Sequence, residues 1–107
     1  MTNNAKFDKP SRDVRLDLLR LVESGEEYDA AVNLSIACAK SPDRWIRINA
    51  LHCFGYIARV YGRLDLEAAL PFIKDALRDT NDAEIAAAAQ DALDDLEVFL
   101  PGFKMPH

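Results

Sequence analysis

Glycine and proline are scarce in this sequence of 107 residues, with four and five copies respectively. An all-β fold needs a turn roughly every 8–12 residues, and those turns depend on these two residue types. The scarcity therefore argues against an all-β fold. Half of the residues are apolar, which is enough for a buried core, and the length allows one domain.

Residues that bind metals or react are also few. The only cysteines, Cys38 and Cys53, lie in apolar stretches without the spacing of a zinc site or a redox CxxC pair. The two histidines are His52, which has no carboxylate four residues further on, and His107. A Ser–His–Asp set, a glycine-rich phosphate loop and a cofactor fingerprint are absent. We expect reduced core thiols, no metal or cofactor, and no enzymatic activity.

The sequence lacks a hydrophobic run long enough to span a bilayer, and no apolar run follows the lysines of residues 1–10 as a secretory signal would require. We therefore expect a cytoplasmic protein that does not contact a membrane. An excess of basic residues is missing too, because the formal net charge is −5. Nucleic acid is not an expected partner, since affinity for it comes mostly from Lys and Arg.

The negative charge is concentrated in the second part of the chain. Residues 1–64 hold ten basic and eight acidic residues, whereas residues 65–107 hold three basic and ten acidic ones. Such local acidity serves solubility in many folded domains, and it also attracts basic partners by charge complementarity. Both interpretations are open.

Apolar residues recur at three- and four-residue steps, which predicts helices. The expected helices cover residues 11–24, 26–39, 42–62, 65–79 and 82–99. Ser41 is the expected N-cap of the third helix, because Pro42 follows it. Pro71 is expected to kink the fourth helix or to start a new one.

Each expected helix has a stripe of residues for the core. The expected stripes are Ala30, Leu34, Ala37 and Cys38 in the second helix, Ile46, Ala50, Cys53, Phe54, Ile57 and Tyr61 in the third, and Ile85, Ala89, Ala92, Leu93 and Leu96 in the last. The expected organisation is a flexible segment over residues 1–10, one helical domain over residues 11–100, and a tail over residues 101–107 in which Phe103 folds back as a cap.

An internal repeat becomes visible when the chain is aligned with itself. Asp43 then aligns with Asp82, Ala50 with Ala89, and Ile57 with Leu96. Each unit is a helix, a tight turn that carries an Asp, and a second helix, and neither hairpin can bury its apolar stripe without the other.

Over residues 28–100 this pattern resembles the HEAT-repeat family, most closely in LEAALPFIKDALRDTNDAEIAAAAQDALDDL and in SPDRWIRINALHCFGYI. The resemblance implies an all-α fold, a short HEAT-like α-solenoid of stacked antiparallel helical hairpins, whose second helices line the concave side. It also implies an Asp–Arg link between neighbouring repeats. Arg47 carries the expected arginine in the first unit, but Ala86 stands at that place in the second.

One motif suggests an alternative function. Arg47 and His52 form an R-x4-H pair, which resembles the catalytic motif of HEPN-type ribonucleases. In that motif His acts as acid or base, and Arg stabilises the charged phosphorus intermediate. A polar residue is expected directly after the Arg, but Ile48 stands there, and the two side chains are about 140° apart around a helix axis.

A mixed polar and aromatic face lies beside the core stripe of the third helix. It is formed at three- and four-residue steps by Trp45, Asn49, His52, Tyr56, Arg59 and Arg63. The equivalent face of the last helix has Glu84, Ala88, Asp91 and Asp95. These faces are either solvated helix surface or a binding surface, since such aromatic and arginine residues are enriched in protein-binding hot spots. The predicted partner-binding residues are Trp45, Asn49, His52, Tyr56, Arg59, Glu84, Asp91 and Asp95.

A short, acidic HEAT-like protein of this kind resembles the immunity proteins of bacterial polymorphic toxin systems, including contact-dependent growth inhibition. That resemblance implies an inhibitor that binds a cognate toxin domain, typically a basic nuclease. The sequence leaves the oligomeric state open, and a monomer is the expectation. A general HEAT-type adaptor or regulatory protein is the alternative.

Overall fold

The computed structural model describes residues 28–104, which form four helices and no strand. They are α3 (Tyr28–Ala39), α4 (Arg44–Tyr61), α5 (Leu66–Leu77) and α6 (Ala83–Phe99). The expected helix over residues 11–24 and the expected flexible segment over residues 1–10 lie outside the described residues. The other four helices were predicted to within a few residues of their ends.

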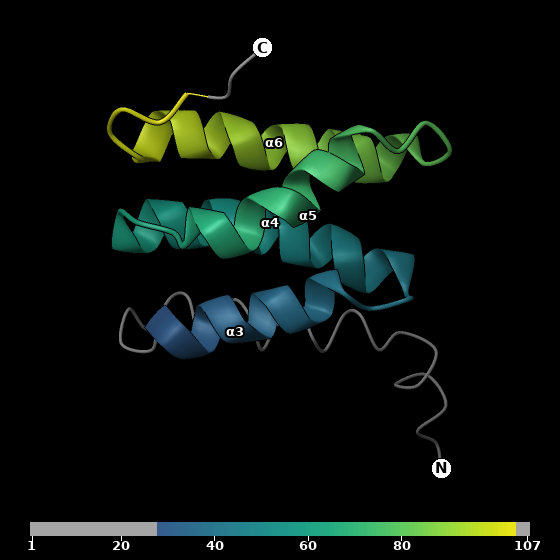
Figure 1. Ribbon diagram of the computed structural model, residues 1–107, viewed down its shortest axis with the longest axis horizontal. Coiled ribbons are helices and arrows are strands. Elements are labelled where there is room, and N and C mark those ends of the chain that lie inside the picture. The colour runs from purple at the N-terminus through teal and green to yellow at the C-terminus, as the bar shows by residue number, and fades with distance from the viewer. Residues whose placement is uncertain (1–27, 105–107) are drawn as a thin grey trace.

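The helices pair as two stacked hairpins, α3–α4 and α5–α6. Figure 1 shows α6, α4 and α3 at successive levels, with α5 lying obliquely in front of α4 and α6. The most extensive packing is between the two second helices, α4 and α6, followed by that of α3 on α4. This arrangement confirms the expected all-α stack of helical hairpins, and it places α4 and α6 side by side.

An aspartate caps the start of α4, α5 and α6 in turn, at Asp43, Asp65 and Asp82. The prediction of Ser41 as the N-cap of α4 is wrong. The Asp43 carboxylate accepts hydrogen bonds from the backbone N–H groups of Trp45 and Ile46 (2.8 and 3.2 Å), while the Ser41 hydroxyl accepts one from Asp43. A carboxylate is the better cap because its negative charge faces the positive end of the helix.

Glycine ends a helix where the sequence predicts it, but proline does not start a new one. Gly62 ends α4 as expected, in the left-handed conformation (φ 68°). The chain continues as one helix through Pro71, so no new helix starts there. Beyond α6, the half-buried Phe103 packs against the core, and its N–H donates to the carbonyl of Leu100 (3.1 Å), as predicted for a folded-back tail.

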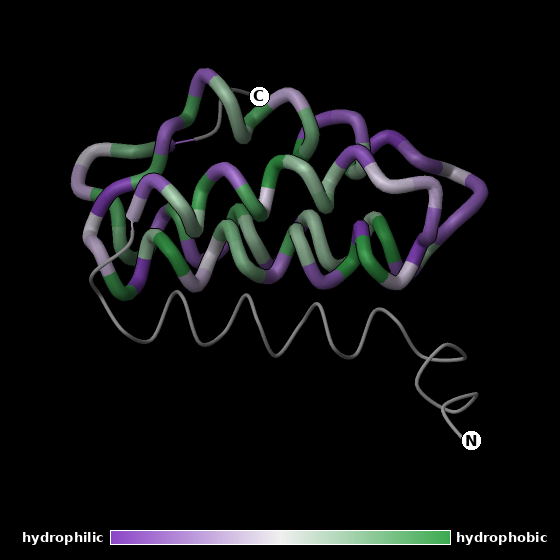
Figure 2. Tube along the Cα trace, turned by 90° about the horizontal axis from the view of Figure 1, so that it is seen from below, coloured by the Kyte–Doolittle hydropathy of each residue, from purple (hydrophilic) through white to green (hydrophobic). Residues whose placement is uncertain are grey.

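The core lies between the four helices. Figure 2 shows apolar and polar segments alternating along each of them. Phe54, Ile57, Ile73 and Leu96 are the largest apolar side chains that are fully buried. Ala50 and Ala89 are fully buried as well, which allows α4 and α6 to approach closely. The predicted stripe of α6 is confirmed, and that of α4 is confirmed except that Ile46 and Tyr61 are only half-buried.

The predicted stripe of α3 is largely wrong. Ala37 is exposed, Ala30 and Leu34 are half-buried, and Cys38 alone is buried as predicted. The buried residues of α3 are Ala31, Val32, Ser35, Cys38 and Ala39. Apolar residues surround this helix on nearly every side, so its sequence does not fix which face meets the core.

The cysteines behave as core residues. Cys38 and Cys53 are buried and not bonded to each other, and burial raises the pKa of the Cys38 thiol. The described part of the chain contains no group of three or more metal-ligating side chains. None of its helices is long and apolar enough to cross a membrane.

Candidate functional site

A groove of about 500 Å³ runs between the two second helices. The side chains that line it are Asn49, His52, Cys53, Tyr56 and Arg59 from α4, and Asp95 and Phe99 from α6. Five of the eight predicted partner-binding residues therefore come together here, namely Asn49, His52, Tyr56, Arg59 and Asp95. Cys53 and Phe99 were not predicted as site residues.

The α4 side of the groove supplies hydrogen-bonding and cationic groups around an aromatic ring. The Arg59 guanidinium lies over the ring of Tyr56, 5.6 Å from its centroid. His52 and Arg59 are exposed, whereas Asn49 and Tyr56 are half-buried. The α6 side supplies the Asp95 carboxylate and the side chain of Phe99, a residue that is 36% exposed. The groove thus combines aromatic surface with charges of both signs.

Gly55 sets the distance between the two walls. It is buried in α4, and a Cβ placed there would lie 3.0 Å from the Cβ and 3.1 Å from the Cγ of Asp95. A side chain at position 55 fits only if the Asp95 side chain moves, so the missing side chain lets the Asp95 carboxylate lie against the α4 backbone. Sequence reasoning missed Gly55, although a glycine in a helix interior costs about 1 kcal/mol relative to alanine and commonly has a packing reason.

Asp95 is the ionisable group of the groove whose pKa is shifted. Burial raises the pKa of its carboxyl group, and the neighbouring charges of Asp91 and Asp94 raise it further. Arg59 and His52 act in the opposite direction but do not cancel these effects. A positive group that entered the groove would stabilise the charged form of Asp95.

Asp91 lies one turn before Asp95 on α6 and is exposed. Its side chain does not line the groove, but its negative charge raises the pKa of Asp95. The structure therefore places Asp91 beside the groove, in an acidic strip on α6 that consists of Asp91, Asp94 and Asp95. Ala88, expected on the same face, is buried in the core instead.

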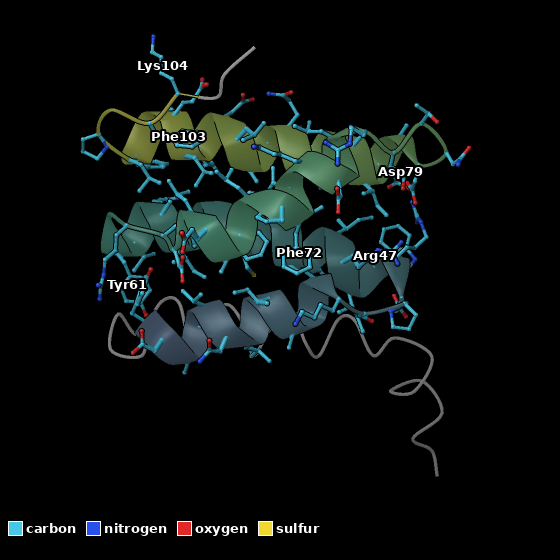
Figure 3. The ribbon with its side chains drawn as sticks, in the orientation of Figure 1. Arg47, Tyr61, Phe72, Asp79, Phe103 and Lys104 are labelled. Atoms are coloured by element: carbon cyan, nitrogen blue, oxygen red, sulfur yellow. The ribbon has the colours of Figure 1, made fainter. Side chains whose placement is uncertain are left out.

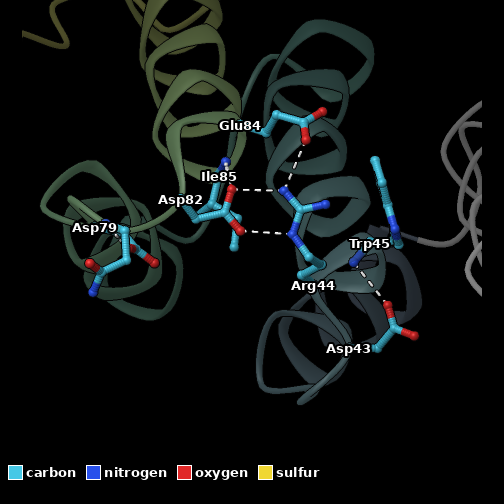
Figure 4. Close-up of polar contacts among 8 residues, drawn as sticks. Asp43, Arg44, Trp45, Asp79, Asp82, Glu84 and Ile85 are labelled. Carbon is cyan, nitrogen blue, oxygen red and sulfur yellow. Dashed lines mark hydrogen bonds and ion pairs between the residues drawn. The ribbon is translucent and has the colours of Figure 1, made fainter.

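Trp45 and Glu84 lie apart from the groove, at the starts of α4 and α6. There Arg44 donates two hydrogen bonds to the carboxylate of Asp82 (2.8 Å each) and one to Glu84 (3.0 Å), as Figure 4 shows. The Arg44 guanidinium also lies over the Trp45 ring, 4.6 Å from its centroid. Glu84 is thus already paired with Arg44 and does not line the groove. That Glu84 and Asp95 contact the same partner stays a prediction.

The same contact corrects the expected link between repeats. Arg44 joins α4 to the N-cap of α6, whereas Arg47 uses its Nη1 to donate to the carbonyls of Ser41 (3.1 Å) and Pro42 (3.2 Å). The Arg47 side chain lines a second pocket, and His52 lines the groove. The two residues of the R-x4-H motif therefore do not converge on one site in this structure.

The Arg44–Asp82 pair gives stability that depends on pH. Hydrogen bonds from Arg44 lower the pKa of Asp82 from 3.8 to about 2. A carboxyl group whose pKa is lowered by folding stabilises the fold above its unfolded pKa, and this contribution is lost as the pH falls through the folded value. We expect Arg44→Met to lower the urea midpoint at pH 5, and the gap from the wild type to close between about pH 4 and pH 2. A gap that stays constant over this range would contradict the assignment.

The close approach at Gly55 can be tested with a double-mutant cycle. Overpacking of this kind typically costs about 1–3 kcal/mol, so Gly55→Val should lower the free energy of unfolding by that amount. In an Asp95→Ala background the cost should fall, because the Cγ and carboxylate oxygens that a side chain at position 55 meets are gone. Urea denaturation of the four proteins measures this coupling, with the exposed Ala87→Val as control. Equal costs in both backgrounds would show that Asp95 does not pack on Gly55.

The comparisons with known proteins agree with this arrangement. The family model described as HEAT repeats matches residues 5–94. No curated protein and no solved structure gives a significant match.

Proposed function

Because the chain belongs to the HEAT-repeat family, we propose that it works by binding another protein in the groove between α4 and α6. The observation that carries the proposal is the groove itself, which is lined from both second helices and has a partly desolvated carboxylate, Asp95, on its α6 side. We assign the chain no catalytic role.

The composition of the groove indicates which kind of partner it accepts. The rings of Tyr56 and Phe99 offer apolar contact area, and exposed His52 and Arg59 offer polar contacts beside them. Aromatic residues and arginine are enriched in binding hot spots, where a side chain of the partner fills a pocket. The acidic strip on α6, with Asp91 beside the groove, favours a partner that places positive charge there.

In its more specific form, the proposal is that the protein is an immunity protein. It would bind a cognate toxin domain, typically a basic nuclease, as a monomer in the cytoplasm, where such a toxin acts. Support comes from the small acidic helical domain and from the acidic strip beside the groove. The alternative is an adaptor or regulatory subunit of a larger assembly, and the HEAT-repeat match favours this form somewhat.

Co-expression distinguishes the two forms. The full chain is produced together with the toxin domain encoded next to its gene, and cell survival and co-purification are measured. An immunity protein restores growth and purifies as a one-to-one complex with that domain. If the toxin kills cells that contain the full chain and no complex forms, the immunity proposal fails.

A further inference from the structure

A second pocket lies away from the groove and shares no lining residue with it. It has a volume of about 210 Å³ and is bordered by the end of α3, the first turns of α4 and α6, and the C-terminal half of α5. Its apolar lining comes from Leu51, Phe72 and Ile85, together with two alanines. Pockets for drug-sized ligands are typically about 300–1,000 Å³, so this one suits a smaller molecule.

Charges of opposite sign border the same apolar lining. Arg47 comes from α4, and Asp75 and Asp79 come from the C-terminal part of α5 and the turn after it. Figure 3 shows Arg47, Phe72 and Asp79 in this part of the molecule. Among the ion pairs of the described residues, none joins Arg47 to Asp75 or Asp79. Asp75 is paired with Arg78 instead. Arg47 and Asp79 are therefore the two opposite charges that share this small pocket without an ion pair between them.

Each charge has a structural reason to be held in place. Two backbone carbonyls, those of Ser41 and Pro42, accept hydrogen bonds from Nη1 of Arg47, which leaves its other N–H groups for a ligand. Asp79 accepts one hydrogen bond at Oδ1 from the N–H of Asn81 (2.9 Å). The C-terminal end of α5 adds the negative end of a helix dipole near the two carboxylates, which favours a cation there.

We propose that this pocket binds a free α-amino acid with an apolar side chain. The ligand carboxylate pairs with the Arg47 guanidinium, the ammonium group with Asp79, and the side chain lies against Leu51, Phe72 and Ile85. A zwitterion is the class of small ligand that meets both charges at once, whereas a simple acid or a simple amine leaves one of them unpaired. The site is independent of the groove and of the partner proposed for it.

The test is an NMR titration of the full chain with three probes of similar size, L-leucine, 4-methylpentanoate and 3-methylbutylamine. The last two lack the ammonium and the carboxylate group respectively. L-leucine should shift the amide signals around Leu51, Phe72 and Ile85. Each analogue should bind at least about tenfold more weakly than L-leucine, because one charge-assisted contact is lost. An unchanged spectrum with L-leucine, or equal binding of all three probes, overturns the proposal.

Two variants assign the contacts. Arg47→Met and Asp79→Asn should each weaken L-leucine binding about tenfold. Asp79→Asn keeps the side-chain oxygen that accepts the hydrogen bond from Asn81, so the turn is preserved. The test therefore stays valid even if Arg47→Met disturbs the start of α4. The controls Lys104→Met and Glu97→Gln make the same changes of charge at exposed positions that do not line the pocket. Wild-type affinity in Asp79→Asn overturns the assignment.

Discussion

Phe54→Ala is expected to lower the free energy of unfolding by about 3–5 kcal/mol, the usual cost of truncating a buried Phe. Phe54 is fully buried in the middle of α4, the helix that packs on both α3 and α6. The cavity left by its ring would weaken the core that α4 shares with its neighbours. Small domains have a total stability of about 5–15 kcal/mol, so this single change removes a large part of it.

Urea denaturation followed by circular dichroism measures the effect. Val98→Ala is the matched control, because it also truncates an apolar side chain but at a position that is 72% exposed. Its cost should stay within about 0.5 kcal/mol. If Phe54→Ala costs no more than Val98→Ala, the hairpins do not share the core described above.

The helices that were predicted best are those with one clearly apolar face. In α6, Ile85, Leu93 and Leu96 recur at helical spacing among polar residues, so their burial could be predicted. In α3, the segment YDAAVNLSIACA offers apolar residues on every side. The face that became buried depends on how α3 packs on α4, which the sequence of α3 alone does not specify.

The α4 side of the candidate site could be predicted from helical spacing, but its contacts with α6 could not. Asn49, His52, Tyr56 and Arg59 follow one another at three- and four-residue steps, so helical geometry alone brings them together. The contact of Asp95 with Gly55 depends on the relative placement of two helices. The pairing of Glu84 with Arg44 also depends on how the helices pack, because the partners of Arg44, Asp82 and Glu84, are 38 and 40 residues away in the chain.

The second large effect is expected in binding to the basic toxin domain proposed as the partner. Asp91→Lys places a positive charge on the acidic strip at an exposed position, where the longer side chain meets no packed neighbour. A like charge opposite a basic partner can cost several kcal/mol. We expect a loss of about 2–3 kcal/mol, which is roughly a hundredfold in affinity. Glu67→Lys makes the same change of charge on an exposed position of α5 and should leave the affinity unchanged.

Asp95 needs a smaller substitution than Asp91. A lysine at position 95 would press on Gly55 and disturb the packing of α4 on α6, so a loss of binding would be ambiguous. Asp95→Asn keeps the shape and removes only the charge. Because folding raises the pKa of the Asp95 carboxyl group, its charged form is disfavoured in the folded state. The neutral variant should therefore be at least as stable as the wild type at pH 7 while it binds a basic partner more weakly.

Trp45 should contribute less to binding than the groove residues. Its indole is 50% exposed and stacks with Arg44 at the start of α4, outside the groove. Hot-spot residues tend to lie near the centre of an interface, surrounded by contacts that exclude water. We therefore expect Trp45→Ala to weaken binding less than Asp91→Lys does.

The most direct test of the groove as the binding surface is calorimetric titration of the toxin domain into the wild type, Asp91→Lys and Glu67→Lys. The account predicts a one-to-one complex that weakens roughly a hundredfold, or about 2.7 kcal/mol, in Asp91→Lys and not in Glu67→Lys. A complex of wild-type affinity in Asp91→Lys would contradict it, because the partner would then bind elsewhere on the molecule.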